Sequence, residues 1–387
     1  MVIAGPGTGK THTLTSRIIY LVEKREVPPS RITAVTFTNK AAKEMRDRLE
    51  GHFGGKEVPG GMNIGTFHAI GLRLLARAGG LKSPVIIGEE EARTVMEEII
   101  QEQGLKLSPR DVLRKISLLK NSATIEGEPV EAIVPREVFD AYCARLEQYG
   151  VMDFDDILLK VLERSSNQNS GNQNSEPDPD NPFAYLLVDE FQDINEVQYR
   201  LIKEWGKKSE SILIIGDPDQ SIYGFRGSDP RYFSRFKEDF RGLCPIRLTQ
   251  NYRSTPEIIA GAAGVIAKQE TGGPALESKR GKGSKIRLIE TGDAFSEAVY
   301  IAKEINRLVG GMDMLDTQAQ AAPGGKKSGA LEPRGFADIA LLYRTNHQAQ
   351  VLEQSWPKKE SPTSSPGGRI SWRNSRSVRP WPFSVTY

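Results

Sequence analysis

The segment at residues 4–11 combines glycines, a lysine and a threonine in an order that suits phosphate binding. A short apolar run at 2–4 precedes it, and a helical pattern over 10–24 follows it. Glycines between a strand and a helix let backbone N–H groups turn toward a phosphate, and the helix N-terminus adds a favourable dipole. Lys10 would neutralise the β- and γ-phosphates, and Thr11 would hold Mg²⁺. The predicted nucleotide-binding residues are Ala4, Gly5, Pro6, Gly7, Thr8, Gly9, Lys10 and Thr11.

An ordinary glycine-rich turn is the alternative interpretation of this segment. Ala4 stands where the pattern G-x-x-x-x-G-K-T has its first glycine. With Gly9, Lys10 and Thr11 in place between a predicted strand and a predicted helix, a phosphate loop is favoured.

Two adjacent carboxylates end a second predicted strand. Asp189 and Glu190 follow the apolar run at 186–188. Asp189 would bind Mg²⁺, directly or through water, and Glu190 would activate the attacking water. A solvated strand end is the alternative, since acidic residues are common there. The phosphate loop earlier in the chain favours hydrolytic chemistry.

Two further strand ends carry polar residues. Gln220 lies just beyond the run at 211–215, at the edge where open α/β sheets bind ligands, and would sense the γ-phosphate. Arg253 would reach the γ-phosphate as an arginine finger, and Tyr252 would stack on the adenine. The alternatives are a polar turn residue, a surface ion pair and a surface aromatic.

The elements that must position these residues alternate between strands and helices. Such alternation predicts a parallel sheet covered by helices, an α/β fold. The predicted strands of the first part are 2–4, 32–37, 185–188 and 211–215, with helices over 10–24 and 39–49. Three further helical patterns, over 89–103, 109–120 and 135–164, have no strong strand between them and predict a helical insertion.

Composition limits the classes of partner. The chain has 387 residues, 26% of them charged, and a net charge of +2, so nucleic-acid binding would need a local groove. Cys143 and Cys244 lack metal-type spacing and fit a reducing cytoplasm. The four histidines are scattered, which argues against a zinc site. No apolar run reaches membrane-spanning length, and we expect no membrane partner and a cytoplasmic location.

Eight sequence blocks occur in the order typical of one protein family. The chain resembles the superfamily 1 DNA helicases of the UvrD/Rep type. The blocks are AGPGTGKT (4–11), TAVTFTNKAAKEM (33–45), GTFHAIGLRLL (65–75), MDFDDIL (152–158), LLVDEFQDIN (186–195), IIGDPDQSIYGFRG (214–227), LTQNYRS (248–254) and ADIALLYRTNHQAQVLE (337–353).

The resemblance implies two RecA-like domains with ATP between them, each carrying an insertion. It also implies ATP-driven 3′-to-5′ movement on single-stranded DNA, with junctions of single- and double-stranded DNA as further partners; oligomeric state is left open. Lys10 and Thr11 would hold phosphate and Mg²⁺, and Asp189 and Glu190 would be the metal ligand and the catalytic base. Gln220 and Arg253 resemble the γ-phosphate sensors, and Tyr252 the adenine-stacking tyrosine.

A DNA track is expected on aromatic, hydroxyl and basic side chains. Bases stack on aromatic faces without regard to sequence, while hydroxyl and positive groups follow the phosphates. Phe67 is better explained by core packing, and Phe225 stands where the family often has tryptophan. The expected DNA contacts are Phe37, Thr66, His68, Tyr223, Phe225 and Arg226.

Domain boundaries follow from the motifs and from composition. Low-complexity polar stretches are expected to be disordered loops. The first RecA-like domain is expected at 1–79 and 183–255, interrupted by a helical insertion at 80–164 and a disordered loop at 165–182. A partial second RecA-like domain is expected at 256–354, with strands at 285–289 and 339–343, a helix over 294–309 and a flexible insert at 310–335. An aberrant tail is expected at 355–387.

The resemblance leads us to expect a fragment, truncated at both ends. Met1 falls inside the first strand, and the upstream segment that helps relatives to recognise adenine is missing. The tail at 355–387 has no structural period, and we hypothesise a reading-frame shift, because a frame one base earlier can be made to spell family-like phrases. An intact gene that encodes 355–369 in frame would overturn the frameshift hypothesis.

Three functions compete. The first is an ATP-dependent helicase or translocase of the repair or replication type, and the second is a fragment that binds nucleotide and single-stranded DNA with little turnover. A P-loop kinase or another NTPase is the third. The ordered blocks and the aromatic-rich segment 220–226 argue against it.

Overall fold

The computed structural model describes residues 1–54, 60–77, 85–121, 134–170, 178, 180–224, 227–267, 275–309 and 334–355. Two compact units, Met1–Ile286 and Arg287–Tyr387, divide the chain, and each is described by itself. The domain boundaries expected from the sequence stay predictions.

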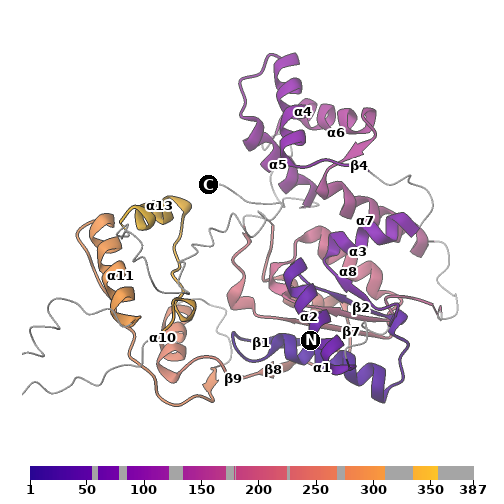
Figure 1. Ribbon diagram of the computed structural model, residues 1–387. Helices are drawn as coiled ribbons and strands as arrows, with labels where there is room; N and C mark the ends of the chain where they lie inside the picture. Colours follow the sequence, from indigo (N-terminus) through magenta and orange to yellow (C-terminus); the bar gives the residue numbers. More distant parts are fainter. Residues whose placement is uncertain are drawn as a thin grey trace, which may run out of the picture. The chain divides into compact units, whose positions relative to one another are not determined.

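A six-stranded parallel sheet organises the first unit, in the order β3-β2-β6-β7-β1-β8 (Figure 1). Val2 in β1 pairs with Ile215 on one side and Ile246 on the other. The α/β fold with a parallel sheet is therefore confirmed. The strands are β1 (Val2–Ala4), β2 (Ile32–Val35), β3 (Asn63–Gly65), β6 (Tyr185–Val188), β7 (Ser211–Gly216) and β8 (Ile246–Leu248).

Helices cover both faces of this sheet, and each face has its own apolar core (Figure 1). Leu14 and Ile18 of α1 pack with Met45 and Leu49 of α2 against one face. Their helical spacing places them on one side of each helix. The helices are α1 (Lys10–Lys24) and α2 (Asn39–His52) on that face, and α3 (Phe67–Arg77), α7 (Phe154–Ser170), α8 (Glu196–Gly206) and α9 (Tyr232–Asp239) on the other.

The helical insertion forms a separate group of helices (Figure 1). It has a third apolar core of its own. The expected helical pattern over 135–164 is not continuous, because the two-residue strand at 151–152 divides it into two helices. Gly150 has a φ of +64°, which suits glycine and ends the preceding helix. The insertion consists of β4 (Val85–Ile86), α4 (Glu89–Glu102), α5 (Pro109–Asn121), α6 (Arg136–Gln148) and β5 (Val151–Met152), with β4 parallel to β5.

Partly buried hydrogen bonds join the insertion to the rest of the unit. Lys120 at the end of α5 donates to Asp153 Oδ2 and to Asp156 Oδ1, each at 2.7 Å. Asn195, which caps the N-terminus of α8, donates from Nδ2 to Asn121 Oδ1 at 2.7 Å. The residue that caps α8 lies five positions after Glu190, so this contact joins the insertion to the segment that carries the two carboxylates.

The polar stretch at 165–182 begins as helix. α7 continues to Ser170, so the prediction of a disordered loop is wrong for residues 165–170. The helix is already nucleated before this stretch, where Leu158 and Val161 are buried. Residues 171–177 and 179 lie outside the described residues.

Beyond β8 the first unit contains β9 (Gln250–Asn251), α10 (Pro256–Ile266) and β10 (Glu277–Ser278), with β9 parallel to β10. In the second unit α11 (Ala294–Leu308) packs against α13 (Asn346–Ser355).

The two strands expected at 285–289 and 339–343 are not formed in the described part of the chain. Leu288 is 97% exposed and Leu342 is 92% exposed. A parallel strand requires a neighbour on its edge and cover on both faces, and an apolar run alone supplies neither. Residues 310–333 and 356–387, which include most of the expected insert and nearly all of the expected tail, lie outside the described residues.

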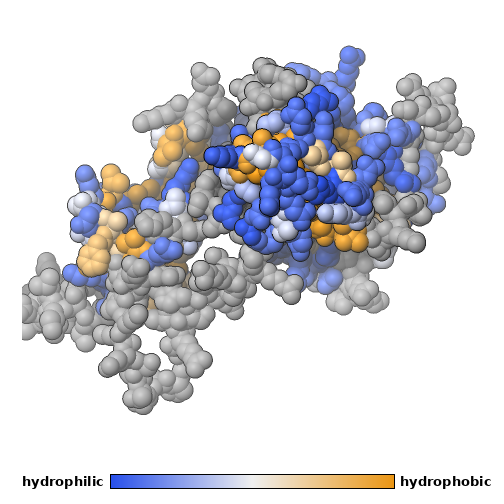
Figure 2. Space-filling model, turned by 90° about the horizontal axis from the view of Figure 1, so that it is seen from above, coloured by the Kyte–Doolittle hydropathy of each residue, from blue (hydrophilic) through white to orange (hydrophobic). Residues whose placement is uncertain are grey.

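The surface seen in Figure 2 is largely hydrophilic, with hydrophobic residues in separate patches. None of the helices within the described ranges is both long and apolar enough to cross a membrane.

Candidate nucleotide-hydrolysis site

The loop between β1 and α1 has the backbone geometry of a phosphate-binding turn. Gly7 and Gly9 have φ values of +69° and +93°, a region that side chains disfavour. The buried Thr8 hydroxyl donates to the Gly5 carbonyl at 2.7 Å and closes the turn. Gly9 is the N-cap of α1 and has no side-chain cap, so N–H groups of the first turn remain available to an anion.

Lys10 and Glu190 meet at the carboxyl-terminal edge of the sheet. Lys10 Nζ lies 3.8 Å from Glu190 Oε2 and 3.4 Å from the Ala4 carbonyl oxygen. Lys10 follows β1 and Glu190 follows β6, and only β7 separates these strands. The strand order therefore brings together a lysine and a carboxylate that are far apart in sequence. Thr11 follows Lys10 in the first turn of α1.

Asp189 is a buried carboxylate beside this pair. It accepts a hydrogen bond from the Glu190 backbone N–H at 3.0 Å. Burial and the neighbouring Glu190 raise the pKa of Asp189 to about 7. The same two causes raise the pKa of Asp193 to about 7, and Asp193 Oδ1 is buried without a hydrogen-bond partner among the described residues. A cation bound here would favour the ionised carboxylates, so the donor set fits Mg²⁺.

Gln220 lies at the same edge, after β7. It belongs to a short 3₁₀ turn, Pro218–Gln220, and donates from Nε2 to Asp217 Oδ2 at 2.5 Å. Burial raises the pKa of Asp217. The expected sensor is thus hydrogen-bonded to Asp217, the residue that follows β7.

Sequence reasoning missed Asn251 as part of the site. Its Nδ2 donates to the Pro6 carbonyl at 2.6 Å, and its Oδ1 accepts from the backbone N–H groups of Arg253 and Ser254 at 2.9 and 2.7 Å. A Cβ at Gly7 would lie 2.7 Å from Arg253 Cβ. Asn251 therefore holds the expected arginine finger against the phosphate loop.

Tyr252 is joined to the same loop through its backbone. Its N–H donates to the Gly7 carbonyl at 3.0 Å, while its side chain is 61% exposed. The hydroxyl donates to Gln250 Oε1 at 2.7 Å. The ring is accessible from solvent, as stacking on a base requires.

Sequence reasoning also missed Gln192, which lies in the 3₁₀ turn Phe191–Asp193. Its Nε2 donates to Glu190 Oε2 at 2.8 Å, and its Oε1 accepts from the Asp217 N–H at 2.9 Å. The signal in the sequence was an amide two residues after the expected catalytic base, between Phe191 and Asp193.

The residues expected to contact DNA have different surroundings. The rings of Phe37 and Tyr223 pack together with centroids 5.2 Å apart. Thr66 Oγ1 accepts the Ala69 N–H and begins α3. Burial lowers the pKa of His68 to about 4, so its imidazole is neutral near pH 7 and carries no charge toward a phosphate. Phe225 and Arg226 lie outside the described residues.

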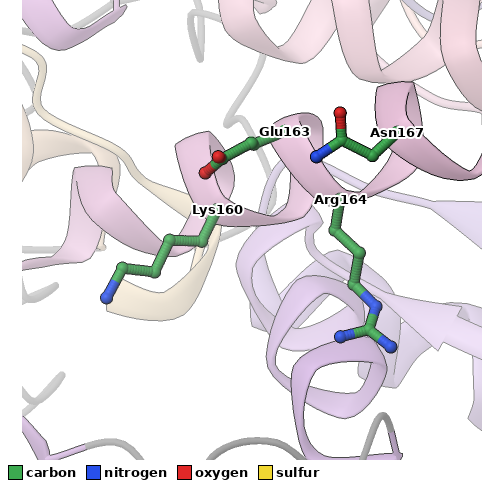
Figure 3. A pocket seen from close by; sticks show the side chains of 4 residues that line it. All are labelled: Lys160, Glu163, Arg164 and Asn167. Carbon is green, nitrogen blue, oxygen red and sulfur yellow. The ribbon is translucent and has the colours of Figure 1, made fainter.

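A hollow of about 410 Å³ lies on α7, away from these residues. Its described lining is Lys160, Glu163, Arg164 and Asn167, which all project from one helix (Figure 3). None of the expected site residues lines it, and one exposed helix surface does not define a ligand.

Sequence comparisons agree with this geometry. The profile described as the UvrD/REP helicase N-terminal domain matches residues 1–241, and the profile of the UvrD-like helicase C-terminal domain matches residues 246–368. The chain therefore belongs to the UvrD/Rep helicase family, whose domains have RecA-like P-loop folds.

Three similar proteins are each called ATP-dependent DNA helicase PcrA. The protein from Leuconostoc citreum is 34% identical over 386 residues, which cover 95% of this chain and 48% of the relative. Those from Staphylococcus epidermidis RP62A and Staphylococcus aureus Mu50 are 33% and 32% identical, each over 95% of this chain and 49% of the relative. The chain thus spans about half the length of these relatives.

Proposed function

We propose that this chain is the ATP-hydrolysing part of a DNA helicase that moves 3′-to-5′ along single-stranded DNA. The convergence of Lys10 and Glu190 at one sheet edge, 3.8 Å apart, carries the proposal. Lys10 neutralises the β- and γ-phosphates, and Glu190 takes the proton of the attacking water. Gln220 and Arg253 respond to the γ-phosphate, and Tyr252 stacks on the adenine. Family membership and the names of the relatives support DNA as the second substrate.

Thr11 and Asp189 would hold Mg²⁺, which would neutralise negative charge on the phosphates. The raised pKa of Asp189 supports this assignment, because a buried carboxylate without a cation is unfavourable.

The DNA track extends this proposal. Phe37, Tyr223 and Phe225 would stack on bases, and Thr66, His68 and Arg226 would follow the backbone. His68 would act as a neutral hydrogen-bonding group, given its lowered pKa. Affinity should fall steeply with added salt, because phosphate contacts release counterions. Junctions of single- and double-stranded DNA are the proposed natural sites.

DNA-stimulated ATP hydrolysis tests the proposal. Lys10→Ala should weaken nucleotide binding, whereas Glu190→Gln should bind nucleotide and lose turnover by about 10²- to 10⁴-fold. Matched controls are Lys40→Ala and Glu44→Gln on the exposed side of α2, which should leave both properties unchanged. Turnover that survives both site variants would contradict the proposal.

The second candidate is a module that binds nucleotide and single-stranded DNA with little turnover. The observation in its favour is the absence of paired strands at 285–289 and 339–343 in the described part of the chain. Nucleotide binding that depends on Lys10, together with no DNA-stimulated turnover and no duplex unwinding, would support this candidate.

A further inference from the structure

Gln192 is a buried polar side chain to which the proposed hydrolysis mechanism gives no task. It is 2% exposed and lies two residues beyond Glu190. A buried amide is costly unless its donors and acceptor are used. Its bonds therefore indicate what it does.

The amide of Gln192 has one orientation that satisfies both neighbours. Glu190 Oε2 is an acceptor and receives the Nε2 donor, while the Asp217 N–H is a donor and requires Oε1. A flipped amide would place acceptor against acceptor and donor against donor. The side chain therefore links the segment after β6 to the end of β7 in a defined geometry.

Gly216 makes room for this link. A Cβ at Gly216 would lie 2.5 Å from Gln192 Oε1, which is closer than real contacts allow. The same Cβ would lie 2.9 Å from the Phe233 ring. A glycine is required at the end of β7 by close approach, since Gly216 does not have a positive φ.

The link continues to the expected γ-phosphate sensor. Asp217, whose N–H is held by Gln192, accepts Gln220 Nε2 on Oδ2. Ser221 Oγ also donates to the Gln192 carbonyl at 3.1 Å. A continuous set of hydrogen bonds thus runs from Glu190 through Gln192 and Asp217 to Gln220.

We propose that Gln192 is a positioning residue that aims the Glu190 carboxylate and couples it to Gln220. The inference rests on the proposed ATP hydrolysis. A displacement of Gln220 when the γ-phosphate leaves is passed to Glu190 through Asp217 and the Gln192 amide. Gln192 touches neither nucleotide nor water in this role, so it sets turnover rather than nucleotide affinity.

Two variants of Gln192 distinguish its hydrogen bond to Glu190 from its hydrogen bond to Asp217. Gln192→Leu removes both hydrogen bonds. Gln192→Glu keeps the shape and an acceptor for the Asp217 N–H, but turns the donor that faces Glu190 into an acceptor. Gln198→Leu is the matched control, because Gln198 is also a buried glutamine in this region and caps α8 without contacting Glu190.

Hydrogen exchange of the Asp217 amide measures its hydrogen bond to Gln192 and does not depend on ATP turnover. In the full chain, exchange in Gln192→Leu should be about tenfold faster or more, because a buried N–H has lost its acceptor. Gln192→Glu and Gln198→Leu should exchange like the original chain. Unchanged exchange in Gln192→Leu would overturn the inference, whether or not the chain hydrolyses ATP.

Steady-state ATPase kinetics tests the hydrogen bond from Gln192 to Glu190. Both Gln192 variants should lose about 10²-fold in kcat, as expected for a misplaced catalytic group, with KM for ATP changed by less than about twofold. Gln198→Leu should keep kcat. Full turnover in Gln192→Glu would overturn the positioning role. An original chain without turnover would instead refute the proposed function, and the exchange measurement would still decide the link.

Discussion

Asn251 and Pro6 are joined by a 2.6 Å hydrogen bond from Nδ2 to the carbonyl, although 245 positions separate them in the sequence. The Asn251 side chain is almost fully buried and also accepts two backbone N–H groups, those of Arg253 and Ser254. One amide therefore fixes the phosphate loop and the expected arginine finger to each other.

Replacing Asn251 by alanine should damage both stability and nucleotide binding. The Pro6 carbonyl and the two N–H groups would lose their partners, at a cost of about 2–4 kcal/mol in the free energy of unfolding. Nucleotide affinity should fall by about tenfold, because the loop is no longer held in shape. Denaturant unfolding and calorimetric titration with ATP measure the two effects.

Asn181→Ala is the matched control for Asn251. Asn181 also donates to a carbonyl and accepts a backbone N–H, but at the surface and away from the loop. It should cost less than about 1 kcal/mol and leave ATP affinity unchanged. ATP binding by Asn251→Ala at the original affinity would show that the amide is dispensable.

Lys120 and Arg145 give a direct comparison of a buried and an exposed cation. Each lies between two carboxylates, but the Lys120 side chain is 3% exposed and that of Arg145 is 20% exposed with exposed partners. Lys120→Ala should lower the free energy of unfolding by about 3–5 kcal/mol, because Asp153 and Asp156, only 15% and 20% exposed, lose the buried cation that lies between them.

Arg145→Ala should cost less than about 1 kcal/mol, as is usual for surface pairs. Urea unfolding followed by far-UV circular dichroism measures both variants. Equal losses of unfolding free energy in the two variants would mean that Asp153 and Asp156 find water or another partner when Lys120 is removed.

Asp155 should make stability depend on pH. Its withdrawal from water and the nearby Asp153 raise the pKa to about 6, although Asn121 donates to it at 2.7 Å. A raised carboxyl pKa means that the folded chain holds the proton more tightly. The contribution of protonated Asp155 to the free energy of unfolding is complete below pH 3.8, the ordinary pKa of an aspartate. It is lost as the pH rises through about 6, the pKa in the folded chain.

Asp155→Asn removes this titration and keeps an acceptor for Asn121. Between pH 4 and pH 6.5, the unfolding free energy of the original chain should fall relative to that of the variant, on the order of 1 kcal/mol after solvent screening. Thermal unfolding at several pH values gives the difference. Parallel pH profiles of the two chains would assign the titration elsewhere.

Local sequence pattern was enough to predict four strands of the six-stranded sheet, β1, β2, β6 and β7, but not β3 or β8. The helix over 10–24 and the strand at 185–188 are confirmed with the same bounds, because apolar spacing and β-branched runs act over a few residues. The runs at 285–289 and 339–343 look the same in the sequence and form no strand in the described chain. Pairing depends on neighbours, which a local pattern does not contain.

Residue type was enough to single out Lys10 and Glu190 separately as candidate site residues, and the fold brings them to within 3.8 Å of each other. Gln192 and Asn251 were missed because an amide is chemically neutral, and its task depends on partners brought close by the fold. The backbone of Glu190 was equally hidden from sequence reasoning. Its φ of 47° and ψ of 49° are left-handed, a conformation that a glutamate adopts only when its surroundings impose it.

The position of β1 between β7 and β8 has a consequence for biosynthesis. Val2 emerges early from the ribosome, but its neighbours Ile215 and Ile246 are made long afterwards. Such distant pairings form slowly and leave apolar strands uncovered in the meantime. Until β7 and β8 have been synthesised, the strand that leads into the phosphate loop has no neighbour to pair with.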